Sequence, residues 1–354
     1  MNAQDITSAS AAALPPLIRH YSTVTAALLP TLCRQIENLF PGDCLKNTGR
    51  ILLVGSGEDY AAALAGRSVF SSLSSYPAEW VEALTPTALR HFIEREKLQL
   101  GSAFVIAIDC AGDDGQLPHA VREAQSTGAK VLLLTARADC PAAALCDWLL
   151  SLPAAGAPLL PETEHFFVSY LALLLLGRAM GLASGKLCDK KAGELLDEIA
   201  DHIDTVSQQA EDLCARARQV AESCADAADI DIIASGRDYP AGYLARMLCY
   251  RRLGQVVTLE ESEDWLHVNM LALDPHRFLT LFFVSGANSS MDRTLRTIAF
   301  AKELGRQVVT VTDMDDHDPL ALALPASRYS WVTPLSQLIP AALLVEMLRL
   351  SRPF

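Results

Sequence analysis

One segment of this chain occurs twice, and the duplication constrains the fold more than any other feature. Residues 54–67 read VGSGEDYAAALAGR and residues 233–246 read IASGRDYPAGYLAR, so serine, glycine, aspartate, tyrosine, alanine and arginine recur at matching positions. A second pair follows at nearly the same separation, because AQSTGAKVLLLTA at 124–136 resembles AKELGRQVVTVTD at 301–313. Two matches at nearly one separation predict a duplicated domain rather than a chance motif.

Each copy begins with an apolar run, continues through a Ser-Gly turn and then shows a helical pattern. This order predicts a strand that feeds the N-terminus of a helix, where free backbone N–H groups can bind an anion. The turn residues Ser56, Gly57 and Ser235 are therefore candidate substrate-binding residues. Serine and glycine also shape such turns without any ligand, so a structural role is the alternative.

The composition excludes several classes of function. A chain of 354 residues suffices for two domains, and its net charge of −13 argues against nucleic acid and anionic membrane surfaces as partners. The nine cysteines form no C-x-x-C pair and the first residues show no signal-peptide pattern, so we expect a cytoplasmic protein with reduced thiols. The apolar stretch at 166–177 is too short to span a bilayer and predicts a buried helix.

Apolar runs alternate with helical patterns in both copies, which predicts three-layer α/β domains with parallel sheets. We expect a helical lead-in at 1–46, a first domain at 47–185, a helical linker at 186–226 and a second domain at 227–354. The expected strands lie near 51–55, 79–82, 103–109, 131–136 and 148–152 in the first copy, and near 230–235, 256–260, 278–285, 307–313 and 329–332 in the second.

Two such domains with Gly-Ser turns resemble the sugar isomerase (SIS) domain family, which includes the isomerase half of glucosamine-6-phosphate synthase and fructosamine-6-phosphate deglycases. The more specific match lies in the second copy. There SGRDYP at 235–240 is similar to the family's G-R-G-x-x-Y-P turn, and DWLHVN at 264–269 aligns with its E-x-x-H-G-P element. The resemblance implies two flavodoxin-like α/β sandwiches in tandem, a phosphosugar ligand, and a homodimer in which one subunit completes the other's site.

Several family positions are altered in this chain. The family's phosphate loop reads S-x-S-G-E-T, but residues 109–114 read DCAGDD, and ionised carboxylates repel a phosphate and cannot donate hydrogen bonds to it. The family's proton-shuttling glutamate falls on Arg251, which cannot act as a general base. The family's T-K segment falls on Glu164-His165, and its C-terminal lysine tail has no counterpart after residues 351–354.

The loop Ser285–Ser290, which reads SGANSS, is the second candidate anion site. Its side chains Ser285, Asn288, Ser289 and Ser290, together with the N–H groups of the helix that follows, are suitable donors for phosphate. Serine and asparagine are also favoured helix caps, so an ordinary capped loop is the alternative.

The family histidine is retained as His267, four residues after Glu263 and three after Asp264. A carboxylate beside a histidine suits acid–base work such as the opening of a sugar ring, so these three residues are the catalytic candidates. A partnered histidine at a surface helix end is the alternative. No second histidine lies at ligand spacing, so we expect no metal.

These features predict a protein that binds a sugar phosphate or a sugar-amine phosphate and processes it by isomerase, deaminase or deglycase chemistry. His267 and the Ser285–Ser290 loop favour an enzyme. Arg251 and the missing lysine tail favour a non-catalytic sugar-phosphate-binding or regulatory protein. We expect no cofactor, and we expect a homodimer.

Overall fold

The computed structural model describes residues 13–39, 49–74, 76–96, 102–153, 161–272 and 274–351. The chain divides into two compact units, one of residues 26–197 and the other of residues 198–354 with the N-terminal residues up to Thr25. The boundaries fall inside the long helices α2 (Leu14–Leu39) and α7 (Asp189–Gln208). The two units are described one at a time below.

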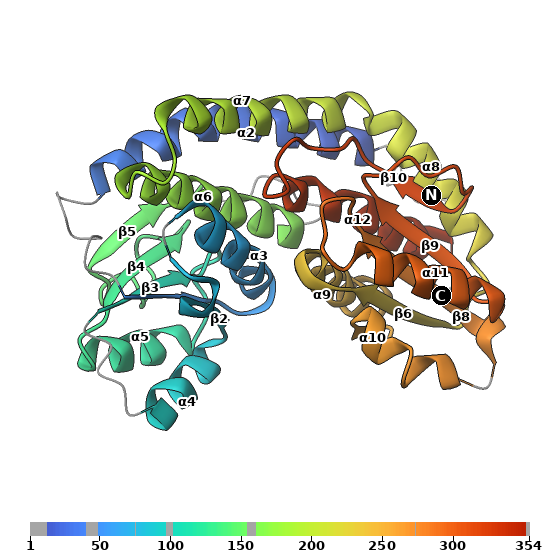
Figure 1. Ribbon diagram of the computed structural model, residues 1–354, viewed down its shortest axis with the longest axis horizontal. Coiled ribbons are helices and arrows are strands. Elements are labelled where there is room, and N and C mark those ends of the chain that lie inside the picture. Colours follow the sequence, from blue (N-terminus) through green and yellow to red (C-terminus); the bar gives the residue numbers. More distant parts are fainter. Residues whose placement is uncertain are drawn as a thin grey trace, which may run out of the picture. The chain divides into compact units, whose positions relative to one another are not determined.

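The unit of residues 26–197 contains a five-stranded sheet in which every pairing is parallel. Its strand order is β2-β1-β3-β4-β5, with helices on both faces (Figure 1). The strands are β1 (Arg50–Val54), β2 (Val81–Leu84), β3 (Ala103–Ile108), β4 (Lys130–Thr135) and β5 (Trp148–Ser151). The helices are α3 (Gly57–Leu73), the 3₁₀ turn η1 (Ala78–Trp80), α4 (Pro86–Glu96), α5 (Leu117–Ser126) and α6 (Pro161–Ala183).

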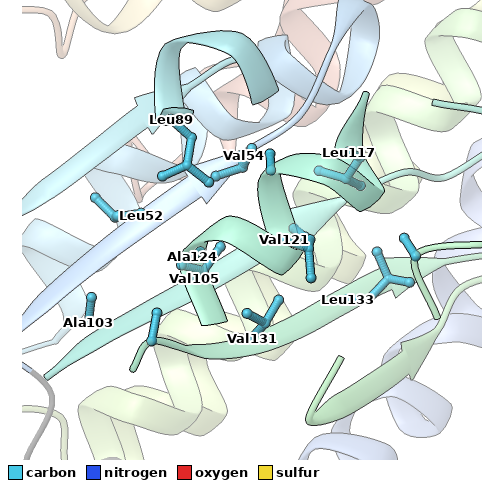
Figure 2. Close-up of a cluster of buried hydrophobic side chains, with 14 of the residues drawn as sticks. Leu52, Val54, Leu89, Ala103, Val105, Leu117, Val121, Ala124, Val131 and Leu133 are labelled. Carbon is cyan, nitrogen blue, oxygen red and sulfur yellow. The ribbon is translucent and has the colours of Figure 1, made fainter. Parts of the chain in front are cut away.

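The core of this unit explains why its strands read as unbroken apolar runs. On one face, Leu52 and Val105 of the sheet pack against Leu89 of α4 and Val121 of α5 (Figure 2). Helices α3 and α6 pack together, and a Cβ added at Gly66 would lie only 2.9 Å from Leu173 of α6. Since helices cover both faces, a strand such as β3 is buried along its whole length.

Helix α6 matches the apolar stretch predicted to be a buried helix. Residues Glu162–Ala183 are long and apolar enough to cross a membrane by length and composition alone, but 78% of the most apolar window is buried inside the fold. Within the described residues no other helix passes that test. Burial of this kind is typical of a core helix.

The other unit, which consists of residues 198–354 and the N-terminal residues up to Thr25, has a second five-stranded parallel sheet, of order β10-β9-β8-β6-β7. Its strands are β6 (Asp229–Ala234), β7 (Val257–Glu260), β8 (Phe278–Val284), β9 (Gln307–Thr312) and β10 (Ala321–Ala323). Read from β7, the order has the same pattern as the first sheet. Its helices are α8 (Ala210–Ser223), η2 (Gly236–Asp238), α9 (Tyr239–Leu248), the π-helix η3 (Cys249–Leu253), α10 (Ser262–Trp265), η4 (Asn269–Leu271), η5 (Pro275–Arg277), α11 (Met291–Glu303) and α12 (Thr333–Ser351).

The prediction of a strand near 329–332 is wrong. The fifth strand of this sheet is β10, which pairs with Thr310–Thr312 of β9. Residues Tyr329 and Trp331 instead stack on each other, with ring centroids 5.5 Å apart, in the turn that leads into α12. Aromatic residues are common in strands, which is why the sequence pattern predicted one here. In the structure these two side chains contact each other, and residues 329–332, which the structure describes, form no strand.

Candidate functional site

Both sheets reverse their strand order at one place, and the two copies of the Ser-Gly turn lie there. The reversal falls between β1 and β3 in the first sheet and between β6 and β8 in the second. Loops beyond the carboxyl ends of such strands are where ligands bind in doubly wound folds. Gly57 and Gly236 open these turns with φ angles of 56° and 57°, a left-handed conformation that glycine adopts without strain.

A buried aspartate connects each turn to the loop that follows the neighbouring strand of the sheet, β3 in the first copy and β8 in the second. In the first copy, Asp59 accepts the backbone N–H of Cys110 at 2.9 Å and the hydroxyl of Ser169 at 3.0 Å. In the second copy, Asp238 accepts both the backbone N–H and the hydroxyl of Ser285, at 3.1 and 2.7 Å. These two aspartates recur in the duplicated segment, so the repeat itself carried the signal, although the sequence analysis did not assign them a role.

The two aspartates differ in how many donors they meet. Asp238 also accepts the side-chain amides of Asn288 and Gln337, each at 2.7 Å. Asp59 has fewer donors, and burial raises its pKa to about 7 against the opposing hydrogen bond from Cys110, with further upward contributions from Glu58 and Asp109. The first copy therefore holds a carboxyl group that titrates near neutrality.

The loop after β3 hydrogen-bonds to its own carboxylates. Asp109 is buried, and its side chain accepts the backbone N–H groups of Asp113 and Asp114 at 3.1–3.4 Å. Asp114 in turn accepts the N–H groups of Gln116 and Leu117, at 2.8 and 3.1 Å, at the start of α5. Its second oxygen accepts the hydroxyl of Ser56 at 2.6 Å. The donors that would face an anion here are occupied by carboxylates of the chain.

The loop after β8 uses its residues in two different ways. Ser285 and Asn288 are buried, and both side chains donate hydrogen bonds to the carboxylate of Asp238. The amide of Asn288 also donates to the backbone carbonyl of Ser235. Ser289 is exposed and Ser290 is half-buried. Among the described residues, neither hydroxyl takes part in a hydrogen bond, although the Ser290 backbone bonds to Asn288 and Thr294.

The free donors of this loop lie next to the duplicated turn. A Cβ added at Gly236 would lie 3.4 Å from the Ser290 hydroxyl oxygen. The backbone N–H groups of Ala287 and Ser289 also lack partners within the described part of the chain, and α11 begins directly after Ser290. One carboxylate opposes an anion here, because Asp313 accepts the N–H of Gly286 at 2.7 Å. Burial raises the pKa of Asp313, and the Asp238 charge acts in the same direction.

Ser235 has a structural partner in α10. Its hydroxyl donates to the Ser262 hydroxyl at 3.0 Å and accepts the Ser262 backbone N–H at 2.9 Å. The Ser262 hydroxyl also lies 3.0 Å from that of Thr294 in α11. This buried chain of hydroxyls connects the duplicated turn, the start of α10 and the helix after the Ser285–Ser290 loop.

His267 lies on the surface just after α10. Its side chain is 71% exposed, and its Nε2 is 3.3 Å from Oε1 of Glu263. Glu263 also accepts a hydrogen bond at 2.6 Å from Arg293 of α11, which holds the pKa of this carboxyl below its ordinary value. Asp264 is exposed, and its backbone carbonyl accepts the N–H of His267 at 3.0 Å. The three catalytic candidates thus lie together on an open surface.

The first copy has an acid–histidine pair of its own, which the sequence analysis noted only as a departure from the family. His165 Nδ1 at the start of α6 lies 3.3 Å from Oε1 of Glu58 in α3, and both side chains are largely buried. The hydrogen bond to Glu58 raises the pKa of His165 against the opposing effect of burial. Arg251, which the family resemblance places at the glutamate position, is exposed in the π-helix at the end of α9.

An open groove of the first unit lies elsewhere. It has a volume of about 680 Å³, lies along β2 and α4, and shares no residue with either duplicated turn. Its walls include Phe92 between charged side chains. The candidate site therefore consists of the loops at the reversal of strand order.

The two sheets and their loops define a doubly wound α/β protein with candidate ligand sites at the reversal of strand order. Residues 44–180 match the model of the SIS domain family. The chain is similar to glutamine–fructose-6-phosphate aminotransferase (isomerizing) of Symbiobacterium thermophilum, with 26% identity over 198 residues, which cover 56% of this chain and 31% of that relative. It spans less than half of the length of the curated relatives it matches.

Solved structures share the fold over nearly the whole chain. The C-terminal domain of glucosamine-fructose-6-phosphate aminotransferase from Francisella tularensis superposes with a TM-score of 0.79 at 14% identity, covering 98% of this chain and 96% of that chain. Glucosamine-6-phosphate deaminase from Thermotoga maritima superposes with a TM-score of 0.65 at 14% identity, covering 93% of each chain. At such identities these matches show the fold alone.

Proposed function

We propose that this chain is a tandem SIS protein that binds a sugar phosphate or sugar-amine phosphate, with the phosphate at the Ser285–Ser290 loop. The observation that carries the proposal is the contrast between the two loops. In the first copy Asp109 and Asp114 occupy the loop's donors, whereas in the second copy the hydroxyls of Ser289 and Ser290 have no partner among the described residues. The phosphate takes up those free donors.

The relatives agree with this class of ligand. The two curated relatives that the chain matches are both named glutamine–fructose-6-phosphate aminotransferase (isomerizing). On this proposal the sugar extends from the loop toward α10, where Glu263 and Asp264 flank His267 and supply acid–base groups for ring opening or for release of an amine. The site of a homodimer would be completed by the neighbouring subunit, and the compartment would be the cytoplasm.

A non-catalytic sugar-phosphate-binding or regulatory protein is the second candidate. It is favoured by Arg251, since a guanidinium stays protonated and cannot carry a proton between neighbouring sugar carbons. It is also favoured by the carboxylate-filled loop of the first copy. Both candidates share the binding step, so binding is the property to test first.

The test replaces Ser289 and Ser290 together with alanine and measures affinity for glucosamine 6-phosphate and fructose 6-phosphate by titration calorimetry. Loss of charged hydrogen bonds should weaken binding by about 1–3 kcal/mol. Ser223→Ala is the matched control, since its hydroxyl lies in α8 and bonds only to the Gln219 carbonyl among the described residues. Unchanged affinity in the double variant, or no binding of either sugar phosphate by the unaltered protein, would contradict the proposal.

A further inference from the structure

A buried ion pair lies under the segment that carries His267. Arg306 and Asp231 have side chains that are 0% and 1% exposed, and the Arg306 Nη1 lies 2.9 Å from Asp231 Oδ2. Asp231 is in β6, and Arg306 directly precedes β9. Two charges removed from water in this way cost several kcal/mol each before their attraction offsets the loss.

The ion pair forms hydrogen bonds to both ends of the short segment Trp265–Asn269. At one end, Trp265 Nε1 donates to the same Asp231 oxygen at 2.8 Å, and its ring lies 5.3 Å below the Arg306 guanidinium carbon. At the other end, Arg306 Nη2 donates to the backbone carbonyl of Asn269 at 2.7 Å. His267 is the middle residue of this segment, so its backbone is fixed from both sides.

The first copy has apolar residues at the two positions that the ion pair occupies in the second copy. In the aligned repeats, Leu52 occupies the position of Asp231 and Ala129 the position of Arg306. Both are buried in the apolar core, where Leu52 faces Leu89 of the regular helix α4 (Figure 2). In the first copy, where the regular helix α4 follows β2, these two positions hold apolar residues. In the second copy, where the short irregular segment of α10 and η4 follows β7, the same two positions hold an ion pair.

Stability of the sheet does not explain the pair, since well-packed apolar residues often replace a buried ion pair at no loss. What the pair adds is a fixed set of directional bonds to Trp265 and Asn269. We propose that Asp231, Arg306 and Trp265 are positioning residues that hold the Trp265–Asn269 segment, and with it His267, beside the carboxyl edge of the second sheet. The role of His267 itself rests on the proposed function.

The test copies the first repeat into the second. The double variant Asp231→Leu with Arg306→Ala removes both charges at once, so neither is left buried and unpaired. The matched control is Asp229→Leu with Arg277→Ala, which removes an exposed ion pair of 3.2 Å beside the same strand. Hydrogen exchange is measured on amides 265–271 and on α11, and affinity is measured for glucosamine 6-phosphate as the probe.

We expect the double variant to fold, with exchange of amides 265–271 faster by about tenfold or more and exchange of α11 unchanged. Probe affinity should fall in the double variant and not in the control. As a second variant, Trp265→Phe replaces the indole with a smaller aromatic ring that has no N–H, and should speed exchange at the same amides. Unchanged exchange at 265–271 in a folded double variant, equal acceleration throughout the unit, or unchanged probe affinity would overturn the proposal.

The exchange measurement needs no ligand, which separates this inference from the proposed function. If the unaltered protein binds no sugar phosphate, the proposed function fails and the exchange result alone decides whether the ion pair holds the segment. If the unaltered protein binds the probe and the double variant binds it equally, the positioning claim fails and the proposed function stands.

Discussion

Asp59 should make the unit of residues 26–197 less stable as the pH rises. Its carboxyl group is buried, with Cys110 and Ser169 as hydrogen-bond donors, and burial raises its pKa from an ordinary 3.8 to about 7. The folded state therefore holds a proton that the unfolded state releases at lower pH. The contribution of Asp59 to stability is fully present below about pH 4, falls as the pH rises, and is lost above about pH 7.

The size of the effect follows from the change in pKa. A rise from 3.8 to about 7 corresponds to roughly 4 kcal/mol between the two ends of that pH range. Asp59→Asn removes the charge and keeps the shape, because the amide can accept from Cys110 and donate to Ser169. We expect this variant to match the unaltered protein within about 1 kcal/mol at pH 4 and to exceed it by up to about 4 kcal/mol at pH 8.

The assay is urea unfolding between pH 4 and pH 8, with native-state hydrogen exchange of β3 amides reporting on the unit that contains Asp59. Asp238→Asn is the control, since Asp238 accepts four hydrogen bonds and an asparagine oxygen cannot replace both carboxylate oxygens. It should lose about 1–3 kcal/mol throughout the range. If the difference in stability between Asp59→Asn and the unaltered protein were the same at pH 4 and pH 8, Asp59 would not titrate in this window and the reasoning would be refuted.

Two further predictions concern assembly and chemistry. Light scattering at micromolar concentration should show a homodimer, which would bury more than roughly 1,000 Å²; the mass of one chain at that concentration would rule this out. In deuterated water, fructose 6-phosphate should exchange the hydrogen beside its carbonyl slowly or not at all, because Arg251 cannot act as the base. Rapid exchange that persists in His267→Ala would contradict both the loss of the base and the role given to His267.

The fold could be predicted because its main signals are local. Apolar strands such as 103–108 and the repeated Ser-Gly turns required no knowledge of distant contacts, and both sheets formed with the parallel pairing that the alternation of elements predicted. The error was the last strand of the second sheet. Strand β10 has only three residues, Ala321–Ala323, and its alanine and leucine lack the β-branched and aromatic side chains that favour a strand. Its pairing with β9 is a tertiary contact.

The candidate site could be predicted only in part. The sequence indicated that the loop at 109–114 had exchanged hydroxyls for carboxylates. It did not indicate that Asp109 and Asp114 turn back onto the N–H groups of their own loop and helix, or that Ser285 and Asn288 are engaged by Asp238 while Ser289 and Ser290 stay free. A donor or acceptor type is written in the sequence, but its partner is decided by which groups the fold brings within about 3 Å.

The sequence by itself determined that the chain carries two copies of a unit in which a strand is followed by a Ser-Gly turn and a helix. Only the tertiary structure decided how the copies differ inside. Asp231 lies within the apolar run of β6, and Arg306 lies 75 positions further on, between Gly305 and Gln307. They become one ion pair under Trp265 only when β6 and the end preceding β9 fold into the same sheet. The physical reason is that a buried charge is tolerated only with a partner, and partners this distant are chosen by topology rather than by local sequence.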